Sequence, residues 1–403
     1  MASIFEIGVF IDYGPDREQS LSLWTYNTAK ATRTCPIAKH LQDPFAEPGY
    51  LQFNPEDPLA TTWVPFDSSV NPAPDWVQLL RTGDNSPNIP YLGWNGAVPS
   101  FTVDLWQPRF LDGFPTEARN DAMQTASSLL SHLNNSTILL LGDSVDRNFV
   151  KQFAWIMQSE AHQESFDGSP VNVTDIKAWG QPHVCDVEGG ISLTLANAFF
   201  YGVMDEVDDF SSAPDWLPPG KAEDRVDVLF KPFADRLERP VSLIQLHAGM
   251  WDLAFFGRQD KDMLFDTNLP LSEQRIRHWI KRATIMIEKI KATWPEVPIV
   301  FRKIQRVGDG SSASGDYGGY TNFFTDVRFQ QMRHMQEIVA RQEGIAVWDF
   351  GNIFEGYQHY QEKVHPLTWP GGIIMAEGLL HHAYLAKYQK DYNRHLSSRS
   401  PGC

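Results

Sequence analysis

Ser144 occupies a turn between a short apolar run and a helical stripe, a position from which a hydroxyl can do chemistry. The run is Thr137-Ile-Leu-Leu-Leu, and Gly142-Asp-Ser follows it directly. Open α/β sheets bind ligands at the carboxyl ends of their strands, and the N–H groups at a helix start favour a developing negative charge there. Ser144 is therefore a candidate nucleophile. Alternatively, Asp143 and Ser144 only cap the helix, as Asp and Ser commonly do.

A serine nucleophile needs a base, because its hydroxyl is protonated at neutral pH, and the base needs an acid that fixes its tautomer. Of the twelve histidines, His365 has the most suitable surroundings, a turn-rich stretch beyond the last predicted strand. Glu362 lies three residues upstream, a spacing that on a single turn lets a carboxylate reach the far ring nitrogen. The alternative is a surface histidine in a Pro-Gly loop. The pair His381-His382 is expected on a helix surface without a third metal ligand, so no metal is predicted.

Three segments resemble, in this order, the successive blocks of the SGNH/GDSL hydrolases: Ile138-Leu-Leu-Leu-Gly-Asp-Ser-Val-Asp-Arg-Asn, Leu246-His-Ala-Gly-Met-Trp-Asp-Leu and Glu362-Lys-Val-His-Pro. The similarity is closer to the PC-esterase branch, which includes plant trichome-birefringence-like O-acetyltransferases and animal PC-esterase-domain proteins. In that branch an arginine follows the serine motif, as Arg147 does here, and Pro-Gly commonly follows the histidine block, as Pro370-Gly371 does. Trp106-Gln-Pro is similar to the N-terminal part of the plant members. The resemblance covers roughly residues 100 to 390.

The resemblance implies a three-layer α/β/α fold with a mainly parallel central sheet. It also implies a serine esterase that acts on a small O-acyl ester, O-acetyl above all, through an acyl-enzyme and without a cofactor. Ser144 would be the nucleophile, His365 the base and Glu362 the acid. Two alternatives stay open: an O-acyltransferase that moves an acyl group between alcohols, and a catalytically silent binding protein of the same fold. The expected partner is a small-molecule or carbohydrate ester.

Two departures from the family pattern concern the acid and the oxyanion donors. The family acid is Asp, and here it is Glu362, with Asp349 at the end of the last predicted strand as the alternative. The asparagine that donates to the oxyanion is replaced by Trp251. The backbone N–H groups of Ser144 and Gly249 would therefore have to supply more of the hydrogen bonds to the oxyanion. The glycine of the second block has three possible matches, which are Gly189, Gly190 and Gly202.

Four residues are candidates for oxyanion or substrate binding: Asp143, Gly249, Trp251 and Arg147. Arg147 would hold the loop or an acidic group of the substrate, or else would only pair with Asp143 or Asp146. Asp252 is expected to cap the segment after its strand rather than to act chemically.

Strands alternate with helices from about residue 117 onward, which predicts a parallel sheet covered on both faces. Further strands are expected at residues 192–201, 242–247, 298–301 and 345–349. Helices are expected between them, the clearest at residues 272–294, with Ser272 as N-cap, and at 326–342. We therefore expect a catalytic domain over residues 117–395 and, over residues 1–116, an irregular lobe rich in Pro and Trp. The Gly- and Ser-rich segment 309–320 is either a linker or a lid.

The composition excludes several classes of protein. The chain has 403 residues, 34 Lys and Arg against 50 Asp and Glu, and a net charge of −16. That charge repels phosphate backbones and anionic lipid surfaces, so no nucleic-acid partner is expected. No segment approaches the ~20 apolar residues of a membrane helix. The composition does not indicate an oligomeric state.

The N-terminal sequence predicts the compartment. It has no basic region before its short apolar stretch, so we expect a cytoplasmic protein. If a leader or anchor precedes this sequence, the secretory-pathway lumen is the alternative. Then Cys35 and Cys185 could pair, and the sequons at Asn134, Asn135 and Asn172 would matter.

Overall fold

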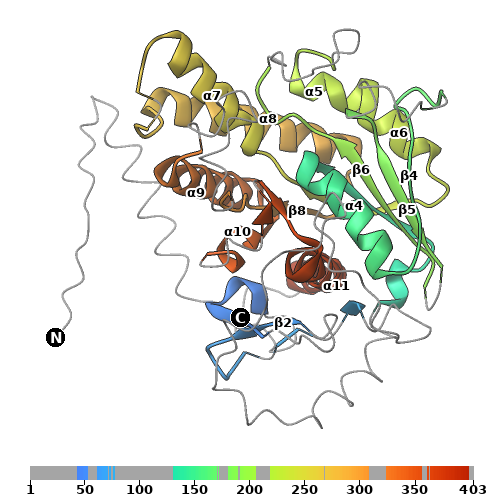
Figure 1. The fold of residues 1–403 in the computed structure, drawn as a ribbon. Helices are drawn as coiled ribbons and strands as arrows, with labels where there is room; N and C mark the ends of the chain where they lie inside the picture. The colour runs from blue at the N-terminus through green and yellow to red at the C-terminus, as the bar shows by residue number, and fades with distance from the viewer. Residues whose placement is uncertain are drawn as a thin grey trace.

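The computed structural model describes residues 43–52, 61–70, 72–73, 76–77, 130–169, 171, 180–188, 191–205, 218–266, 268–307, 324–355, 361–362 and 364–398 (Figure 1). The side chains of residues 361, 362, 368 and 388–398 are outside this description. The predicted boundary between residues 116 and 117, the Gly- and Ser-rich segment 309–320, and Trp106-Gln-Pro also lie outside the described residues. The two-domain division therefore stays a prediction.

Seven strands form the central sheet, in the order β4-β5-β6-β3-β7-β8-β9. Five of them, β3, β6, β7, β8 and β9, run parallel, whereas β5 is antiparallel to both β4 and β6. The strands are β3 (Ser136–Gly142), β4 (Ala161–Gln163), β5 (His183–Val187), β6 (Leu193–Phe199), β7 (Val241–Leu246), β8 (Ile299–Arg302) and β9 (Ala346–Trp348). The predicted mainly parallel sheet is confirmed, and the antiparallel edge of β4 and β5 is an addition to it.

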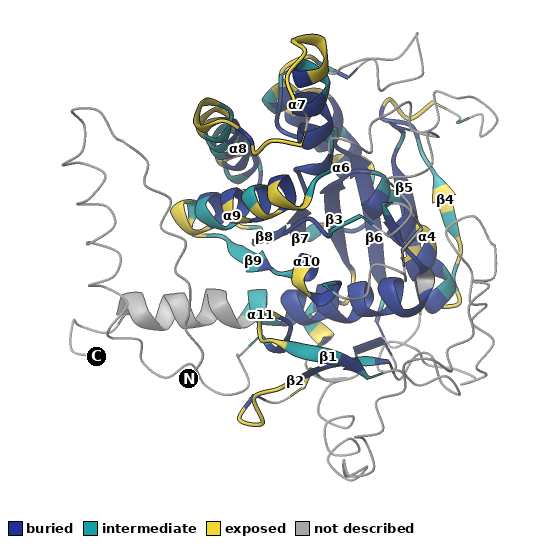
Figure 2. Ribbon diagram, turned by 60° about the vertical axis from the view of Figure 1, so that its left-hand side comes forward, coloured by how far each residue is buried: buried dark blue, intermediate teal, exposed yellow. Residues whose placement is uncertain are grey.

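Helices cover both faces of the sheet (Figures 1 and 2). One face packs on α4 (Ser144–Ile156) and α11 (Ile373–Ser398). The other packs on α5 (Ala222–Arg225), α6 (Lys231–Arg236), α7 (Met250–Asp262), α8 (Glu273–Thr293) and α9 (Asp326–Glu343). A short helix, α10 (Phe350–Ile353), follows β9. The protein is thus a three-layer α/β structure, as predicted.

The central strand β3 shows why this sequence forms a buried sheet. Every residue of β3 is buried, and its apolar side chains divide between the two helical layers. Ile138 and Leu140 pack with α4 and α11, while Leu139 and Leu141 pack on the opposite side. A strand with helices on both faces needs such a continuous apolar run, because neither side meets water.

The helices α8 and α9 lie where the spacing of apolar residues predicts them. Ser272 accepts the N–H of Arg275 with its side chain and so caps α8. Trp279 and Ile287 from its apolar face are fully buried against the sheet layer. Helix α9 ends at Gly344, which adopts φ +63, the left-handed conformation that commonly ends a helix.

Part of the predicted N-terminal lobe packs on α11. A hairpin of β1 (Gly49–Gln52) and β2 (Thr62–Pro65) contributes to the same core as α11. The Glu377 carboxylate of α11 accepts the N–H groups of Trp76 at 2.8 Å and Val77 at 3.0 Å. This cover corrects the expectation for the histidine pair: His381 and His382 are buried, because the N-terminal segment packs over the face of α11 that carries them.

No described helix combines the length and apolar character that crossing a membrane requires. Cys185 is a free, buried thiol on β5, and burial raises its pKa to about 12. Cys35 lies outside the described residues, so the structure does not test the pairing with Cys185 that a secretory location would allow.

Candidate active site

Ser144 is the first residue of α4 and lies at the carboxyl end of β3. The turn is tight, because Asp146 folds back over Gly142: a Cβ at Gly142 would lie 1.9 Å from Asp146 Oδ2. Asp143 is the N-cap, and its Oδ1 accepts the N–H of Val145 at 2.9 Å. Asp143 therefore caps the helix, while Ser144 stays half-buried and accessible.

His365 reaches Ser144 from a segment 221 residues further along the chain. It begins β11 (His365–Pro366), which pairs antiparallel with β10 (Gln361–Glu362). His365 Nε2 lies 2.9 Å from Ser144 Oγ, a distance at which the serine hydroxyl can donate to a neutral imidazole. The structure thus brings the two residues together as the sequence predicts.

Two buried glutamine amides hold the backbone on either side of His365. Gln305 Nε2 donates to the carbonyl oxygen of Val364, and Gln152 Nε2 donates to that of Pro366, each at 2.9 Å. No local pattern of the sequence marks these glutamines, because their role depends on contacts with residues distant in the sequence.

The two candidate acids have different surroundings. Glu362 is paired directly with His365 in the register of β10 and β11, although its side chain is outside the description. Asp349 lies 2.5 Å from Lys303 Nζ and accepts a hydrogen bond from Asn352 at 2.7 Å. Both contacts are made by Oδ2, so one oxygen of the Asp349 carboxylate is already engaged by two other groups.

Asp146 is the centre of a buried polar cluster directly beneath the serine turn. Its carboxylate accepts from Gln245 Nε2 at 2.6 Å, lies 2.9 Å from His247 Nδ1 and pairs with Arg302 Nη2 at 2.8 Å. Burial alone would raise the pKa of Asp146, but Arg302 and His247 outweigh it and hold the pKa below its usual value. The local sequence does not indicate this role, because an acidic residue in a first helical turn is typical of a simple partner of the helix dipole.

A metal ion does not fit this cluster. Ligand atoms of Asp143, Asp146 and His247 lie within 4.8 Å of one another, a spacing that a cation could bridge. However, the guanidinium of Arg302 already binds Asp146 Oδ2, the oxygen that also faces His247. Arg302 therefore supplies the positive charge that compensates the buried carboxylate of Asp146.

Gly249 and Trp251 lie at the start of α7, next to the carboxyl end of β7. Gly249 has φ +136, and a Cβ there would lie 2.9 Å from Met332 Cγ, so both the backbone and the space favour glycine. Trp251, in the place of the family's asparagine, packs edge-on against Tyr201, with ring centres 5.2 Å apart. Its indole belongs to an aromatic group at this edge of the sheet that includes Phe199.

Arg147 lies one turn into α4 from Ser144, with its guanidinium 5.6 Å from the ring centre of Phe199. It also contacts the side chain of Asn148. The sequence predicted an ion pair of Arg147 with Asp143 or Asp146 as one possibility. Among these described residues that ion pair is not formed, and Asp146 pairs with Arg302 instead. Arg147 is half-buried at the same edge as Ser144.

Asp252 holds the loop after β6 rather than the segment after its own strand. Its Oδ1 accepts the N–H groups of Val203 at 2.9 Å and Met204 at 3.2 Å, and burial raises its pKa to about 6. In this loop Gly202 has φ +90, and a Cβ there would lie 2.4 Å from Asp252 Oδ1. Gly202 thus follows the strand next to β3 at the same edge as Ser144, whereas Gly189 and Gly190 lie outside the described residues.

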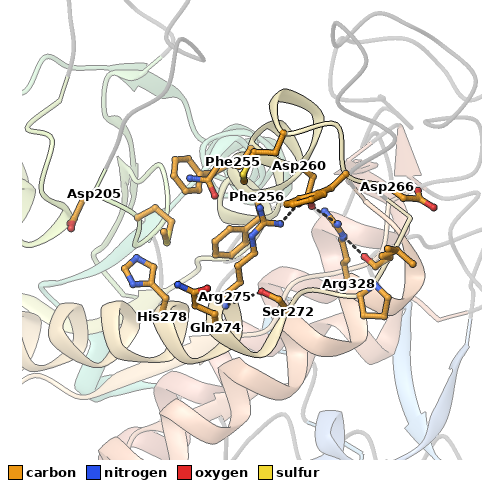
Figure 3. A pocket seen from close by; sticks show the side chains of 16 residues that line it. Asp205, Phe255, Phe256, Asp260, Asp266, Ser272, Gln274, Arg275, His278 and Arg328 are labelled. Atoms are coloured by element: carbon orange, nitrogen blue, oxygen red, sulfur yellow. Dashed lines mark hydrogen bonds and ion pairs between the residues drawn. The ribbon is translucent and has the colours of Figure 1, made fainter. Parts of the chain in front are cut away.

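A cavity of about 720 Å³ lies between α7 and α8 (Figure 3). None of the predicted site residues lines it. Figure 3 shows two of its arginines, Arg275 and Arg328, directed at the buried carboxylate of Asp260. The cavity contains no nucleophile and base in contact, so we place the candidate site at Ser144 instead.

Comparisons with known proteins give structural matches only. A scan against protein-family models finds no match, and a search of curated proteins finds none either. Among solved structures, Est24, a carbohydrate acetylesterase from Sinorhizobium meliloti, is similar over 63% of this chain and 99% of its own, at 10% identity and a TM-score of 0.34. Axe2, an acetylxylan esterase from Geobacillus stearothermophilus, covers 62% of this chain and 94% of its own, at 12% identity and a TM-score of 0.34.

A third match is the aryl esterase of M. smegmatis, similar over 64% of this chain and 99% of its own, at 12% identity and a TM-score of 0.32. At such TM-scores and identities these matches say nothing about the reaction or substrate of this chain. Its fold class rests on its own sheet order and helical layers.

Proposed function

We propose that this protein is a serine esterase of the SGNH type that hydrolyses a small O-acyl ester, in particular an O-acetyl ester. The observation that carries the proposal is the 2.9 Å distance between Ser144 Oγ and His365 Nε2 at the carboxyl edge of a mainly parallel sheet. Nucleophile and base in hydrogen-bonding contact are the geometric requirement for attack by a serine. We propose the PC-esterase branch as the subgroup, because Arg147 and Pro370-Gly371 match the pattern of that branch.

In the proposed reaction Ser144 Oγ attacks the ester carbonyl carbon while His365 Nε2 takes the hydroxyl proton. His365 then returns this proton to the leaving alcohol as the carbon–oxygen bond breaks, which leaves the acyl group on Ser144. Water attacks the acyl-enzyme with its proton passing to His365, and Ser144 leaves with a proton restored. Every proton is thus returned, and no cofactor enters the steps.

We assign the acid to Glu362. The support is its backbone pairing with His365 and the engagement of Asp349 by Lys303 and Asn352. Glu362→Gln should therefore lower kcat by at least tenfold more than Asp349→Asn does. The opposite order would assign the acid to Asp349.

For the oxyanion we propose the backbone N–H groups of Ser144, Gly202 and Gly249 as donors. Gly202 and Gly249 both adopt a positive φ shortly after strands adjacent to β3. Asp143 would hold the first of these donors in place as the cap of α4. Trp251 and Arg147 would border the ester.

The test is covalent labelling with a fluorophosphonate, followed by peptide mapping, together with turnover of para-nitrophenyl acetate. We expect the label on Ser144, and Ser144→Ala and His365→Ala should each remove nearly all turnover, because members of such a unit act together. Ser69→Ala and His334→Ala change exposed residues away from the site and serve as controls. An unchanged intact mass after labelling would instead support a silent binding protein.

Release of the acyl group to water or to a second alcohol separates the esterase from the acyltransferase. Product analysis with and without an added acceptor alcohol makes this distinction. We expect free acid as the main product in both cases. Transfer that dominates at modest acceptor concentrations would establish the acyltransferase.

A further inference from the structure

Only one line of residues on α4 is accessible, and it begins at Ser144. The line continues through Arg147 and Lys151 to Trp155, while every other residue of the helix is buried (Figure 2). Spacings of three and four residues place side chains on one face of a helix. At 1.5 Å per residue, Arg147 and Lys151 lie about 4.5 Å and about 10 Å from Ser144 along the axis. We call these four residues the α4 stripe.

The α4 stripe is basic in a protein whose net charge is −16. The adjacent strands add two imidazoles, His183 from β5 and His162 from β4. The basic residues of the stripe act on His183: burial, together with the positive charges of Lys151 and Arg147, lowers the pKa of His183 to about 3. The pKa of Lys151 is likewise lowered, by burial and by Arg147.

Two acidic residues near the α4 stripe, Asp146 and Glu164, contact other residues. Asp146 lies beneath it and pairs with Arg302, and Glu164 faces His162 at 3.4 Å. In the part of the chain that the structure describes, no carboxylate forms an ion pair with Lys151. Arg147 and Lys151 are like charges four residues apart on one helix, and such charges repel one another. An anion bound beside Lys151 would reduce this repulsion.

We propose that the α4 stripe binds an anionic group on the alcohol part of the ester substrate. This inference rests on the proposed esterase function and names its substrate class: an ester whose alcohol carries a carboxylate, a sulfate or a phosphate. With the acyl carbon at Ser144, the alcohol extends along α4, and its anion lies between the guanidinium of Arg147 and the ammonium of Lys151. Arg147 is steadied on its other side by the Phe199 ring.

The test compares acetyl esters that differ in charge. The anionic esters are para-acetoxybenzoate, para-acetoxybenzenesulfonate and para-acetoxyphenyl phosphate, and the neutral one is para-acetoxybenzamide. The measured quantity is the ratio of kcat/KM for an anionic ester to kcat/KM for the neutral ester. Intrinsic reactivity cancels when this ratio is compared between variants. The three anionic esters distinguish carboxylate, sulfonate and phosphate recognition.

We expect Lys151→Gln to lower this ratio about threefold and Lys151→Glu, which reverses the charge, to lower it about tenfold. The preference for the anionic esters should also weaken as salt is added, because ions screen exposed charges. Lys281→Glu is the matched control, since it makes the same charge change at an exposed lysine within α8. It should leave the ratio within twofold of the wild-type value. A ratio that Lys151→Glu leaves unchanged overturns the inference.

Equilibrium binding separates this inference from the proposed function. Calorimetry measures the Kd of para-hydroxybenzoate and of para-hydroxybenzamide for the Ser144→Ala protein, with and without Lys151→Glu. Tighter binding of the benzoate that Lys151→Glu abolishes supports the stripe even if Ser144 is never labelled and no ester is turned over. Equal binding of the two alcohols overturns the stripe, whatever the esterase assays show.

Discussion

Gln152 lies on the same helix as Ser144, and its side-chain amide donates to the carbonyl oxygen of Pro366, the residue after His365, at 2.9 Å. The helix that carries the proposed nucleophile therefore also holds the segment that carries the proposed base. A Cβ at Gly372 would lie 2.8 Å from Gln152 Oε1, so this segment also packs closely against the glutamine. We regard Gln152 as a positioning residue.

Gln152→Leu should lower kcat about tenfold with little change in KM, because small displacements of a catalytic group are costly. Stability should fall by about 1–3 kcal/mol, since the Pro366 carbonyl loses its buried donor. Steady-state kinetics and urea unfolding measure the two effects. Gln331→Leu is the control: Gln331 makes two hydrogen bonds to the backbone of Leu271, far from Ser144. It should cost stability alone, and equal losses of kcat in both variants would contradict the positioning role.

The pH dependence of stability should reveal Asp252. Burial raises its pKa in the folded protein to about 6 from the usual 3.8. The stabilisation by protonation is therefore fully present below about pH 4 and is lost as the pH rises through about 6, which amounts to about 3 kcal/mol. Asp252→Asn keeps an oxygen for the N–H groups of Val203 and Met204 but cannot ionise. Relative to wild type, the variant should gain stability between pH 4 and 7 in urea unfolding. A constant difference across this range would refute the raised pKa.

Substitutions at two glycines with positive φ should differ in cost. Gly202→Ala would place its Cβ 2.4 Å from Asp252 Oδ1 at φ +90, whereas Gly344→Ala at φ +63 meets nothing within 4 Å. The left-handed conformation alone costs about 1–2 kcal/mol, and the clash adds to this only at Gly202. We expect a loss of about 3 kcal/mol or more for Gly202→Ala against about 1 kcal/mol for Gly344→Ala. Comparable losses would mean that the loop after β6 shifts freely.

Arg302→Met should be strongly destabilising, by about 3–5 kcal/mol, because it leaves the Asp146 carboxylate buried without its guanidinium. Adding Asp146→Asn should recover part of this loss, since the uncompensated charge is then removed. Urea unfolding of the two single variants and the double variant gives the coupling free energy. Strictly additive effects would show that the two groups do not interact as the geometry indicates. Because the pKa of Asp146 is held low, its contribution is present above about pH 4 and is lost on acidification.

Local patterns of sequence were sufficient for much of the framework. The buried strand β3, the turn at Gly142-Asp143-Ser144 and the helices α8 and α9 were all predicted, because apolar periodicity and capping residues act over a few positions. The strand–helix alternation also predicted the parallel sheet. The edge strand β4 and its neighbour β5 were missed, because short strands that pair antiparallel lack a continuous apolar run.

The sequence by itself determined which residue types could form a site and that Ser144 would lie at a strand end. Only the tertiary structure decided that Ser144 Oγ meets His365 Nε2, that Asp146 pairs with Arg302 rather than with Arg147, and that His381 and His382 are buried. Each of these depends on the order of strands in the sheet and on which segment covers which helix. Such contacts join residues more than a hundred positions apart, and no local periodicity encodes them.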